Sequence, residues 1–161
     1  QRQMCIRDRS RNIPGPSVQS PLAINGKNIS SSICYEIAYP DLVRSADDDP
    51  AFILTVSNDT WFGSSIGPWQ HLQLARMRAL ENERWLIRAT NNGVTAVINS
   101  KGQVLASLPQ FTRGVLRQDV EMRSGHTPFK SFGSWPILSI AFAVLIFCSN
   151  RIQKIKTGYG I

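Results

Sequence analysis

Cys34 is the residue of this sequence best suited to covalent chemistry, and a carboxylate, Glu36, follows it two positions later in the stretch SSSICYEIAYPD. A cysteine reacts as the thiolate, which forms at neutral pH when a cation, a helix N-terminus or a base lies nearby. A carboxylate close to a thiol raises the pKa of the thiol, so Glu36 opposes thiolate formation unless it acts as the base or orients the reacting groups. From this stretch alone, Cys34 is either a nucleophile or a small residue that fills the core.

The other metal-binding and nucleophilic residue types form no further site. The three cysteines, at positions 5, 34 and 148, match neither a zinc motif nor a disulfide framework in number and spacing. His71 and His126 have no cysteine or histidine at ligand spacing. His71 falls near the start of a predicted helix, where a capping or packing role is favoured over catalysis. We therefore expect no metal ion and no cofactor.

The formal net charge of +7 suggests nucleic-acid binding, but this charge belongs to the two ends of the 161-residue chain. Residues 1–11 hold four arginines and one aspartate, and residues 151–161 hold three basic residues and no acid, a net charge of +3 at each end. Between them lie eleven basic and ten acidic residues, without a basic stripe interleaved with aromatic residues. We therefore expect no nucleic-acid partner.

The elements that must position Cys34 alternate between strands and helices. Residues 27–34 are predicted to form a strand that ends at the cysteine, and 40–44 a short helix that begins at a proline. The apolar, β-branched run 51–58 is typical of a strand buried on both faces. In 68–90, leucines and alanines recur on one stripe, which predicts a long helix.

The following segments complete one modest domain. Residues 94–108 predict a hairpin, because two β-rich runs flank a Ser-Lys-Gly turn, and 113–122 predict a further strand. Residues 1–11 show neither an apolar period nor a helix cap, so we expect an unstructured tail of doubtful origin. The order of strands and helices predicts a layered α/β fold.

The C-terminal segment differs in composition, since 132–148 contain no charged residue. A helix of that length rises about 26 Å, slightly less than the roughly 30 Å hydrocarbon core of a bilayer. Trp135 lies where an interfacial aromatic residue would, and the basic tail 151–161 follows directly, as positive residues do on the cytoplasmic side. We expect a transmembrane helix over 131–150, with the α/β domain on the outer side of the membrane. A buried core helix is the alternative.

Four stretches carry a specific resemblance in combination: ICYE, TVSNDTWFG, GPWQHLQLARMRALENERWLIRATNNG and PQFTRGVL. Together with the apolar C-terminal segment, they resemble the apolipoprotein N-acyltransferases, which are bacterial inner-membrane enzymes with a catalytic domain of the nitrilase fold. A general nitrilase would share the cysteine strand and the helix region, but not the SND-WFG and GPWQH blocks. The resemblance implies that residues 12–130 are the C-terminal part of a nitrilase-like α-β-β-α sandwich, followed by the transmembrane helix.

The resemblance also implies a reaction in which Cys34 is the nucleophile. The thiolate would take an acyl chain from a membrane phospholipid as a thioester, and the free α-amine of a lipoprotein's N-terminal diacylglyceryl-cysteine would then accept it. A covalent intermediate of this kind splits one difficult transfer into two easier steps. The implied partners are the phospholipid, the diacylated lipoprotein and the bilayer. The implied location is the inner membrane, with the catalytic domain on the periplasmic side and the C-terminus in the cytoplasm.

Four further residues receive expected roles beside this nucleophile. Glu36 supports the site through hydrogen bonds or is a purely structural acid. The backbone N–H of Tyr35, which follows the nucleophile, is a candidate donor to the oxyanion. Trp61 and Phe62, on a loop flanked by a glycine, line the entrance for the acyl chain or only pack.

The family mechanism uses two more groups, a glutamate base and a lysine that stabilises the oxyanion, and both precede the cysteine strand. Here the residues before Cys34 include one acid, Asp8, and one lysine, Lys27, and neither lies in the family's surrounding motif. We therefore expect the chain alone to lack useful acyltransferase activity. The alternatives are a nitrilase-type amidase that hydrolyses a small amide, and a non-catalytic, membrane-tethered fragment that only binds or folds poorly.

Overall fold

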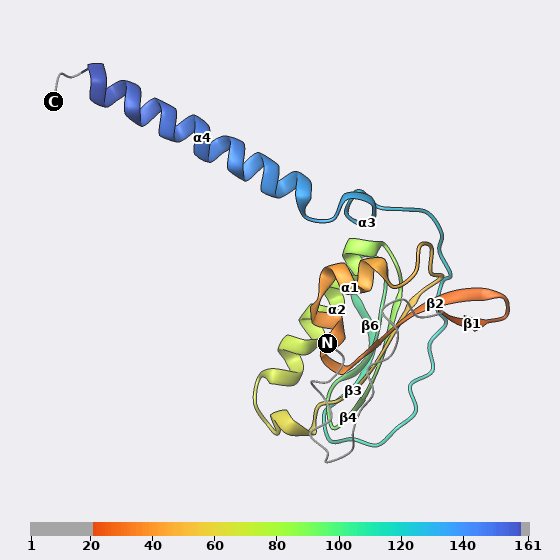
Figure 1. Cartoon of the computed structure of the whole chain (residues 1–161). Helices are drawn as coiled ribbons and strands as arrows, with labels where there is room; N and C mark the ends of the chain where they lie inside the picture. Colours follow the sequence, from red (N-terminus) through yellow and green to blue (C-terminus); the bar gives the residue numbers. More distant parts are fainter. Residues whose placement is uncertain (1–20, 159–161) are drawn as a thin grey trace, which may run out of the picture.

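The structure, a computed structural model, describes residues 21–158, with the backbone alone at residue 150 and beyond residue 151. The described residues form a six-stranded mixed sheet with α2 packed against one face (Figure 1), so the predicted α/β class is confirmed. The strands β1 to β6 lie in chain order across the sheet, and β2, β3 and β4 are parallel. Their bounds are Leu22–Ile24, Lys27–Ile33, Ile53–Asn58, Leu86–Asn91, Thr95–Ile98 and Val104–Leu108.

Parallel pairing brings the residues that follow β2 and β3 to the same edge of the sheet. Ile33 at the end of β2 pairs with Val56 of β3, so the segments after both strands emerge side by side. The crossovers that return the chain to the opposite edge are short helices and one long helix. These are η1 (Cys34–Ala38), α1 (Pro40–Ser45), η2 (Thr60–Phe62) and α2 (Gly67–Asn82). The predicted strand up to Cys34 and the helix from Pro40 agree with these bounds to within one residue.

Helix α2 is shorter than the sequence pattern predicts. It begins at Gly67, with Pro68 in its first turn, and ends at Asn82 because Glu83 adopts a left-handed φ of 50° and donates its N–H to the last carbonyl groups. Residues 86–91 then form the central strand β4. The helix predicted over 68–90 is therefore wrong beyond Asn82. Residues 86–91 instead form a strand that pairs with β3 on one side and β5 on the other.

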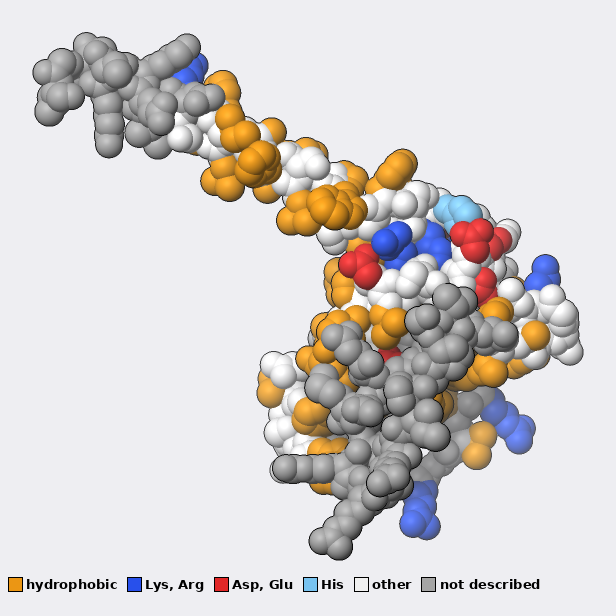
Figure 2. Space-filling model, viewed as in Figure 1, with side chains coloured by type: hydrophobic (Ala, Val, Ile, Leu, Met, Phe, Trp, Pro, Cys, Tyr) orange, Lys and Arg blue, Asp and Glu red, His pale blue; other side chains and the backbone are white. Residues whose placement is uncertain are grey.

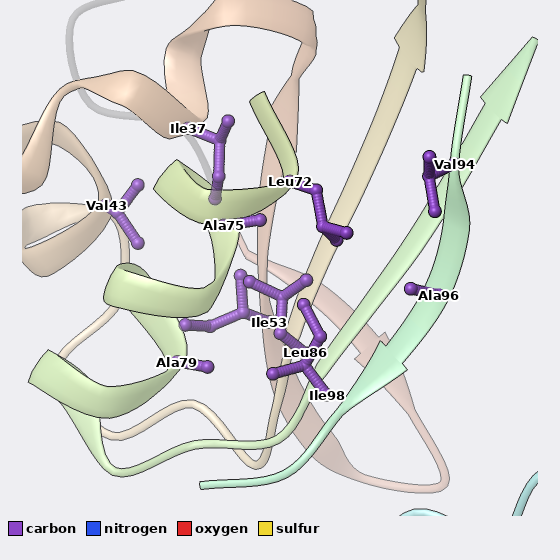
Figure 3. Packing of buried hydrophobic residues seen from close by; sticks show 10 residues of the cluster. All are labelled: Ile37, Val43, Ile53, Leu72, Ala75, Ala79, Leu86, Val94, Ala96 and Ile98. Carbon is purple, nitrogen blue, oxygen red and sulfur yellow. The ribbon is translucent and has the colours of Figure 1, made fainter. Parts of the chain in front are cut away.

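The main core lies between α2 and the sheet (Figure 3). On α2, Leu72, Ala75 and Ala79 recur at helical spacing, and they face Ile53 of β3 and Leu86 of β4. Each of these five residues is at most 4% exposed. Burying an isoleucine or leucine side chain contributes about 1.5–3 kcal/mol, so this layer holds the two strands that carry the site.

The opposite face of the sheet is only partly covered by the described residues. A second cluster of Ile29, Ala51 and Phe52 lies there, with Val120 packed against it. Nearer the edge that holds Cys34, Val56 of β3 is 43% exposed. The prediction that 51–58 is buried on both faces is therefore wrong for this part of the strand.

The hairpin predicted over 94–108 is present as β5 and β6. The strand predicted over 113–122 is wrong, because this stretch has no regular secondary structure and Val115 is 82% exposed. A short helix, α3, follows at Pro128–Phe132 and is capped by Thr127, whose hydroxyl oxygen accepts a hydrogen bond from the N–H of Lys130.

Helix α4 spans Trp135–Gly158 and extends away from the sheet, with apolar side chains exposed along it (Figure 2). Within the part of the chain that the structure describes, no helix combines the length and the apolar character that a membrane crossing requires. The transmembrane helix predicted over 131–150 is therefore corrected. Gly133 interrupts that range, and the uncharged part of α4 before Arg151 rises about 24 Å, less than the roughly 30 Å of a hydrocarbon core. The cytoplasmic C-terminus, which was inferred from that crossing, is not confirmed.

Several predictions fall on residues outside the described range. These are the unstructured tail over 1–11, the first residues of the domain assigned to 12–130, and the last three residues of the basic tail 151–161. The described part of that tail continues α4 as backbone.

Candidate catalytic site

Cys34 lies at the turn between β2 and η1. Its φ of 54° is in the left-handed region, which residues with a side chain occupy rarely, and the residue is 8% exposed. A sharp, strained turn after a strand is the arrangement that projects a nucleophile out of an α/β sheet. The structure holds the Cys34 sulfur in a disulfide bond, so any nucleophilic chemistry requires the reduced protein.

Glu36 stabilises this turn on the side of the preceding strand. Its Oε2 accepts a hydrogen bond of 2.8 Å from the backbone N–H of Ile33, the last residue of β2. Its own carbonyl oxygen accepts from the N–H of Tyr39, which closes η1. These contacts hold the turn in place, and the role of Glu36 in catalysis stays a prediction. Tyr35 lies between Cys34 and Glu36 in the chain, and its backbone N–H belongs to the peptide that follows Cys34.

Asp59, directly after β3, is the centre of a buried ionic network that the sequence analysis did not identify. Its Oδ1 accepts hydrogen bonds from Ser57 Oγ at 2.9 Å and from His71 Nδ1 at 3.1 Å. Its Oδ2 accepts one of 2.6 Å from Nη2 of Arg88 on β4. The side chains of Asp59 and Arg88 are both 0% exposed. Burial alone raises the pKa of Asp59, but the hydrogen bond from His71 and the charge of Arg88 outweigh burial and hold the pKa below its ordinary value.

We expect the Asp59 carboxylate to make the fold sensitive to acid. Because the folded-state pKa lies below 3.8, the carboxylate contributes its stability fully above that pH and loses it as pH falls through the folded-state pKa. The free energy of unfolding, measured with urea between pH 7 and pH 2, should therefore fall more steeply at the acid end in the wild type than in Asp59→Asn. Asp41→Asn, which changes an exposed ion pair with Arg44, should follow the wild type. Parallel curves for the wild type and Asp59→Asn would contradict this expectation.

His71, in the second turn of α2, connects Asp59 to the backbone of the candidate nucleophile. Its Nε2 lies 3.1 Å from the carbonyl oxygen of Cys34, opposite the ring nitrogen that contacts Asp59. The residue is 3% exposed, and the centroid of its ring is 6.3 Å from that of Tyr35 and 6.4 Å from that of Phe62. The sequence analysis expected a capping or packing role for His71, and it did not anticipate the contacts with Asp59 and with the carbonyl oxygen of Cys34.

The two aromatic residues expected at an acyl-chain entrance are placed differently. Phe62 is 37% exposed and contacts the His71 ring edge-on, which brings it close to the Cys34 turn. Trp61 precedes it in η2 and is 73% exposed. The structure therefore joins Phe62 to the group around Cys34, whereas it leaves Trp61 at the surface.

Gly93 provides the space that Asp59 occupies. A Cβ atom at this position would lie 2.3 Å from Asp59 Oδ2, and the network holds that carboxylate in place. We expect Gly93→Ala to lower the free energy of unfolding by about 1–3 kcal/mol, the usual effect of overpacking. Gly114→Ala, where the added Cβ meets the movable end of Leu108 at 3.3 Å, is the control in the same urea titration and should cost less. Equal losses in the two variants would refute the steric account.

Lys27 does not join the group around Cys34. It begins β2, and Cys34 follows the end of that strand, so the two are separated by about 20 Å of extended chain. Asp8 lies outside the described residues. Among the residues that the structure describes, no three side chains of the types that bind metals are grouped at ligand distance.

A polar hollow of about 350 Å³ lies at a different place, between α1 and α3. Lys130 of α3 is its central cation, and Nζ donates to the carbonyl oxygens of Arg44 and Asp47. Arg44 Nη1 in turn donates to the carbonyl oxygen of Lys130 at 3.2 Å. Burial lowers the pKa of Lys130, although Asp48 and Asp47 oppose this shift. The lysine thus serves to tie α3 to the end of α1.

Comparison with known sequences identifies relatives over most of the chain. The family model described as carbon-nitrogen hydrolase matches residues 3–126. The apolipoprotein N-acyltransferase of Pseudomonas syringae pv. tomato is 51% identical over 142 residues, which are 87% of this chain and 28% of that protein. The enzyme of the same name from Pseudomonas paraeruginosa is 47% identical over 133 residues, which are 83% of this chain and 26% of that protein. The chain therefore spans little more than a quarter of the length of these curated relatives.

Solved structures show the same kind of fold. A carbon-nitrogen hydrolase from Helicobacter pylori G27 matches with a TM-score of 0.53 at 14% identity, over 61% of this chain and 42% of that chain. A double mutant of the amidase from Nesterenkonia sp. AN1, in complex with acrylamide, matches with a TM-score of 0.51 at 24% identity, over 61% of this chain and 40% of that chain. At these identities the likeness concerns the fold alone.

Proposed function

Since the chain belongs to the carbon-nitrogen hydrolase family and is a homologue of the apolipoprotein N-acyltransferases, we propose that it forms the nucleophile-bearing part of a lipoprotein acyltransferase. The substrates are a phospholipid as acyl donor and the N-terminal α-amine of a diacylated lipoprotein as acceptor. The observation that carries this proposal is the position of Cys34, in a left-handed turn at the edge of the sheet where parallel strands end. Ligand sites of open α/β sheets form at this edge.

In the first half-reaction, the Cys34 thiolate attacks the carbonyl carbon of a phospholipid acyl ester. The tetrahedral oxyanion collapses with cleavage of the ester C–O bond, and the lysophospholipid alkoxide leaves and takes up a proton. The acyl chain remains on Cys34 as a thioester. In the second half-reaction, the lipoprotein α-amine attacks the thioester carbonyl, forms an amide with loss of a proton, and releases the thiolate.

The neighbours of Cys34 support defined parts of this reaction. The backbone N–H of Tyr35 donates to the oxyanion, because the residue after a nucleophile commonly supplies such a donor. Glu36 keeps the turn in place through its hydrogen bond from the N–H of Ile33. Phe62 and the exposed ring of Trp61 offer apolar contact to the acyl chain.

We place the reaction at the bacterial inner membrane, because both substrates carry acyl chains that stay in a bilayer. The periplasmic side for the catalytic part rests on the relationship to the apolipoprotein N-acyltransferases alone. The exposed apolar side chains of α4, among them Trp135 and Phe147, support contact of this helix with lipid. Lipid contact through α4 would keep Cys34 near both substrates.

The proposal is tested in a complete enzyme. Residues 21–149 replace the matching segment of the Pseudomonas syringae relative, and acyl transfer from phospholipid vesicles to a diacylated lipopeptide is followed by mass spectrometry under reducing conditions. We expect transfer by the chimera. A chimera that unfolds cooperatively but does not transfer the acyl chain would overturn the proposal. Hydrolysis of a small amide, without acyl transfer, would favour the amidase alternative.

The 161-residue chain on its own should show little or no transfer in the same assay. Lys27 lies at the opposite end of β2 from Cys34, and loss of an oxyanion donor costs about 10²–10³-fold in rate. The family's general base also precedes the cysteine strand, and loss of such a base lowers the rate by about a further 10²–10⁴-fold. Transfer by the purified, reduced chain that disappears in Cys34→Ala would contradict this prediction. The amide NMR spectrum of the same sample tests the alternative of a poorly folded fragment, which would show narrow signal dispersion.

A further inference from the structure

His71 faces a hydrogen-bond acceptor with each of its two ring nitrogens. Nδ1 lies 3.1 Å from a carboxylate oxygen of Asp59, and Nε2 lies 3.1 Å from the carbonyl oxygen of Cys34. A neutral imidazole carries one N–H and one lone pair, so one of these contacts would then place a lone pair against an acceptor. A proton on Asp59 would not resolve this, because Oδ1 already accepts from Ser57 and Oδ2 from Arg88. Both contacts are hydrogen bonds only when both nitrogens carry a proton.

We propose that His71 is a positioning residue that is protonated on both ring nitrogens and, by donating to the carbonyl oxygen of Cys34, fixes the peptide between Cys34 and Tyr35. The proposal rests on the proposed function only where it assigns that peptide's N–H to the oxyanion. The protonation state and the hydrogen bond stand on the geometry of the described residues alone.

The consequence for Tyr35 follows from the planarity of the peptide bond. The carbonyl oxygen of Cys34 and the N–H of Tyr35 belong to the same rigid trans unit and point in opposite directions. When His71 holds the oxygen, it therefore also sets the direction of the N–H. Glu36 accepts a hydrogen bond from the N–H of Ile33, the residue before Cys34. The left-handed turn at Cys34 is therefore fixed by Glu36 on one side and by His71 on the other.

The surroundings of the ring accommodate a positive charge. Asp59 supplies a buried negative charge, and Arg88 contacts the other oxygen of that carboxylate rather than the ring itself. The rings of Tyr35 in η1 and Phe62 in η2 lie beside the imidazole, and Glu36 is the carboxylate of η1. His71 lies beyond the first turn of α2, where the positive end of the helix dipole has fallen off.

A charged imidazole beside the Cys34 turn also favours the thiolate over the thiol. The same side chain would therefore contribute twice, by directing the Tyr35 N–H and by raising the population of the attacking form of Cys34. This second effect gives the proposal a readout that a merely structural histidine would not produce.

The first measurement is the ring ¹⁵N NMR spectrum of the full, reduced chain at neutral pH. We expect both His71 nitrogens to show the shifts of protonated nitrogen. The variant His126→Gln leaves His71 as the remaining histidine and so assigns its signals without changing the site. An unprotonated Nδ1 or Nε2 of His71 in this spectrum would overturn the proposal.

The second measurement is the rate at which iodoacetamide alkylates Cys34 in the reduced chain, followed by peptide mass spectrometry across pH. We expect His71→Gln to slow alkylation about tenfold at neutral pH and to move the pH profile of the rate upward, because loss of a nearby positive charge lowers the thiolate population of Cys34. His126→Gln should leave rate and profile unchanged. An unchanged profile in His71→Gln would also overturn the proposal. Neither readout involves acyl transfer, so their failure is distinguishable from failure of the proposed function.

Discussion

Replacing Asp59 with alanine should lower the free energy of unfolding by about 3–5 kcal/mol, the usual cost of breaking a buried ion pair by removing one partner. Arg88 is fully buried on β4, and Asp59 is its charged partner. Burial already lowers the pKa of Arg88 against the attraction of Asp59, so without the carboxylate its guanidinium would remain in the core as an uncompensated charge. His71 would lose its Nδ1 acceptor at the same time. Urea unfolding at pH 7 measures the change.

Two comparisons make this prediction specific. Asp41→Ala removes an aspartate whose side chain is 72% exposed and paired with Arg44, and it should cost at most about 1 kcal/mol. The double variant Asp59→Leu with Arg88→Met replaces both charges, and it should be closer in stability to the wild type than Asp59→Ala, because the buried guanidinium is no longer left without its partner. A loss in Asp59→Ala no larger than that in Asp41→Ala would show that the pair does not hold the fold together.

Replacing Cys34 with alanine in the chimera should abolish acyl transfer. Removal of a covalent nucleophile that acts as a unit with its neighbours typically costs on the order of 10⁶-fold in kcat. The change in stability should be small by comparison, because alanine keeps most of the volume of a side chain that is already small. The assay is the transfer of a phospholipid acyl chain to a diacylated lipopeptide, together with mass spectrometry of the thioester on the Cys34 peptide.

Cys148→Ala is the matched control for this loss. Cys148 is a free and exposed cysteine on α4, so its replacement should leave both transfer and the acylated Cys34 peptide unchanged. Thermal unfolding of both variants shows whether they remain folded. A folded Cys34→Ala chimera that still transfers the acyl chain would remove Cys34 from the reaction.

Local signals account for the parts of the fold that could be predicted. The strand that leads to Cys34, the helix that starts at Pro40 and the hairpin over 94–108 are each encoded by a few adjacent residues. The helix predicted over 68–90 was wrong in its last turns. The local sequence there suits a strand as well as a helix, and the two neighbouring strands of the fold decide for the strand. The strand predicted over 113–122 failed for the opposite reason, since its β-branched residues find no partner strand.

The network behind Cys34 was outside the reach of sequence reasoning. Asp59, His71 and Arg88 meet because β2, β3 and β4 are parallel and α2 returns over them, and no short-range spacing encodes that meeting. Arg88 was also assigned to the helix predicted over 68–90, whereas it lies on the central strand β4. The nucleophile itself was identified through a resemblance of whole blocks, and not from the geometry of its own turn.

The reciprocal hydrogen bonds between Lys130 and Arg44 have a mechanical consequence for the turn at Cys34. They fasten α3 to the end of α1, and two residues outside any helix, Gly133 with a φ of 61° and Ser134, separate α3 from α4. A sideways load on α4 therefore reaches this short connection before it reaches the fastening. Bending there would leave α1 in place, and with it the Cys34 turn that precedes α1 in the chain.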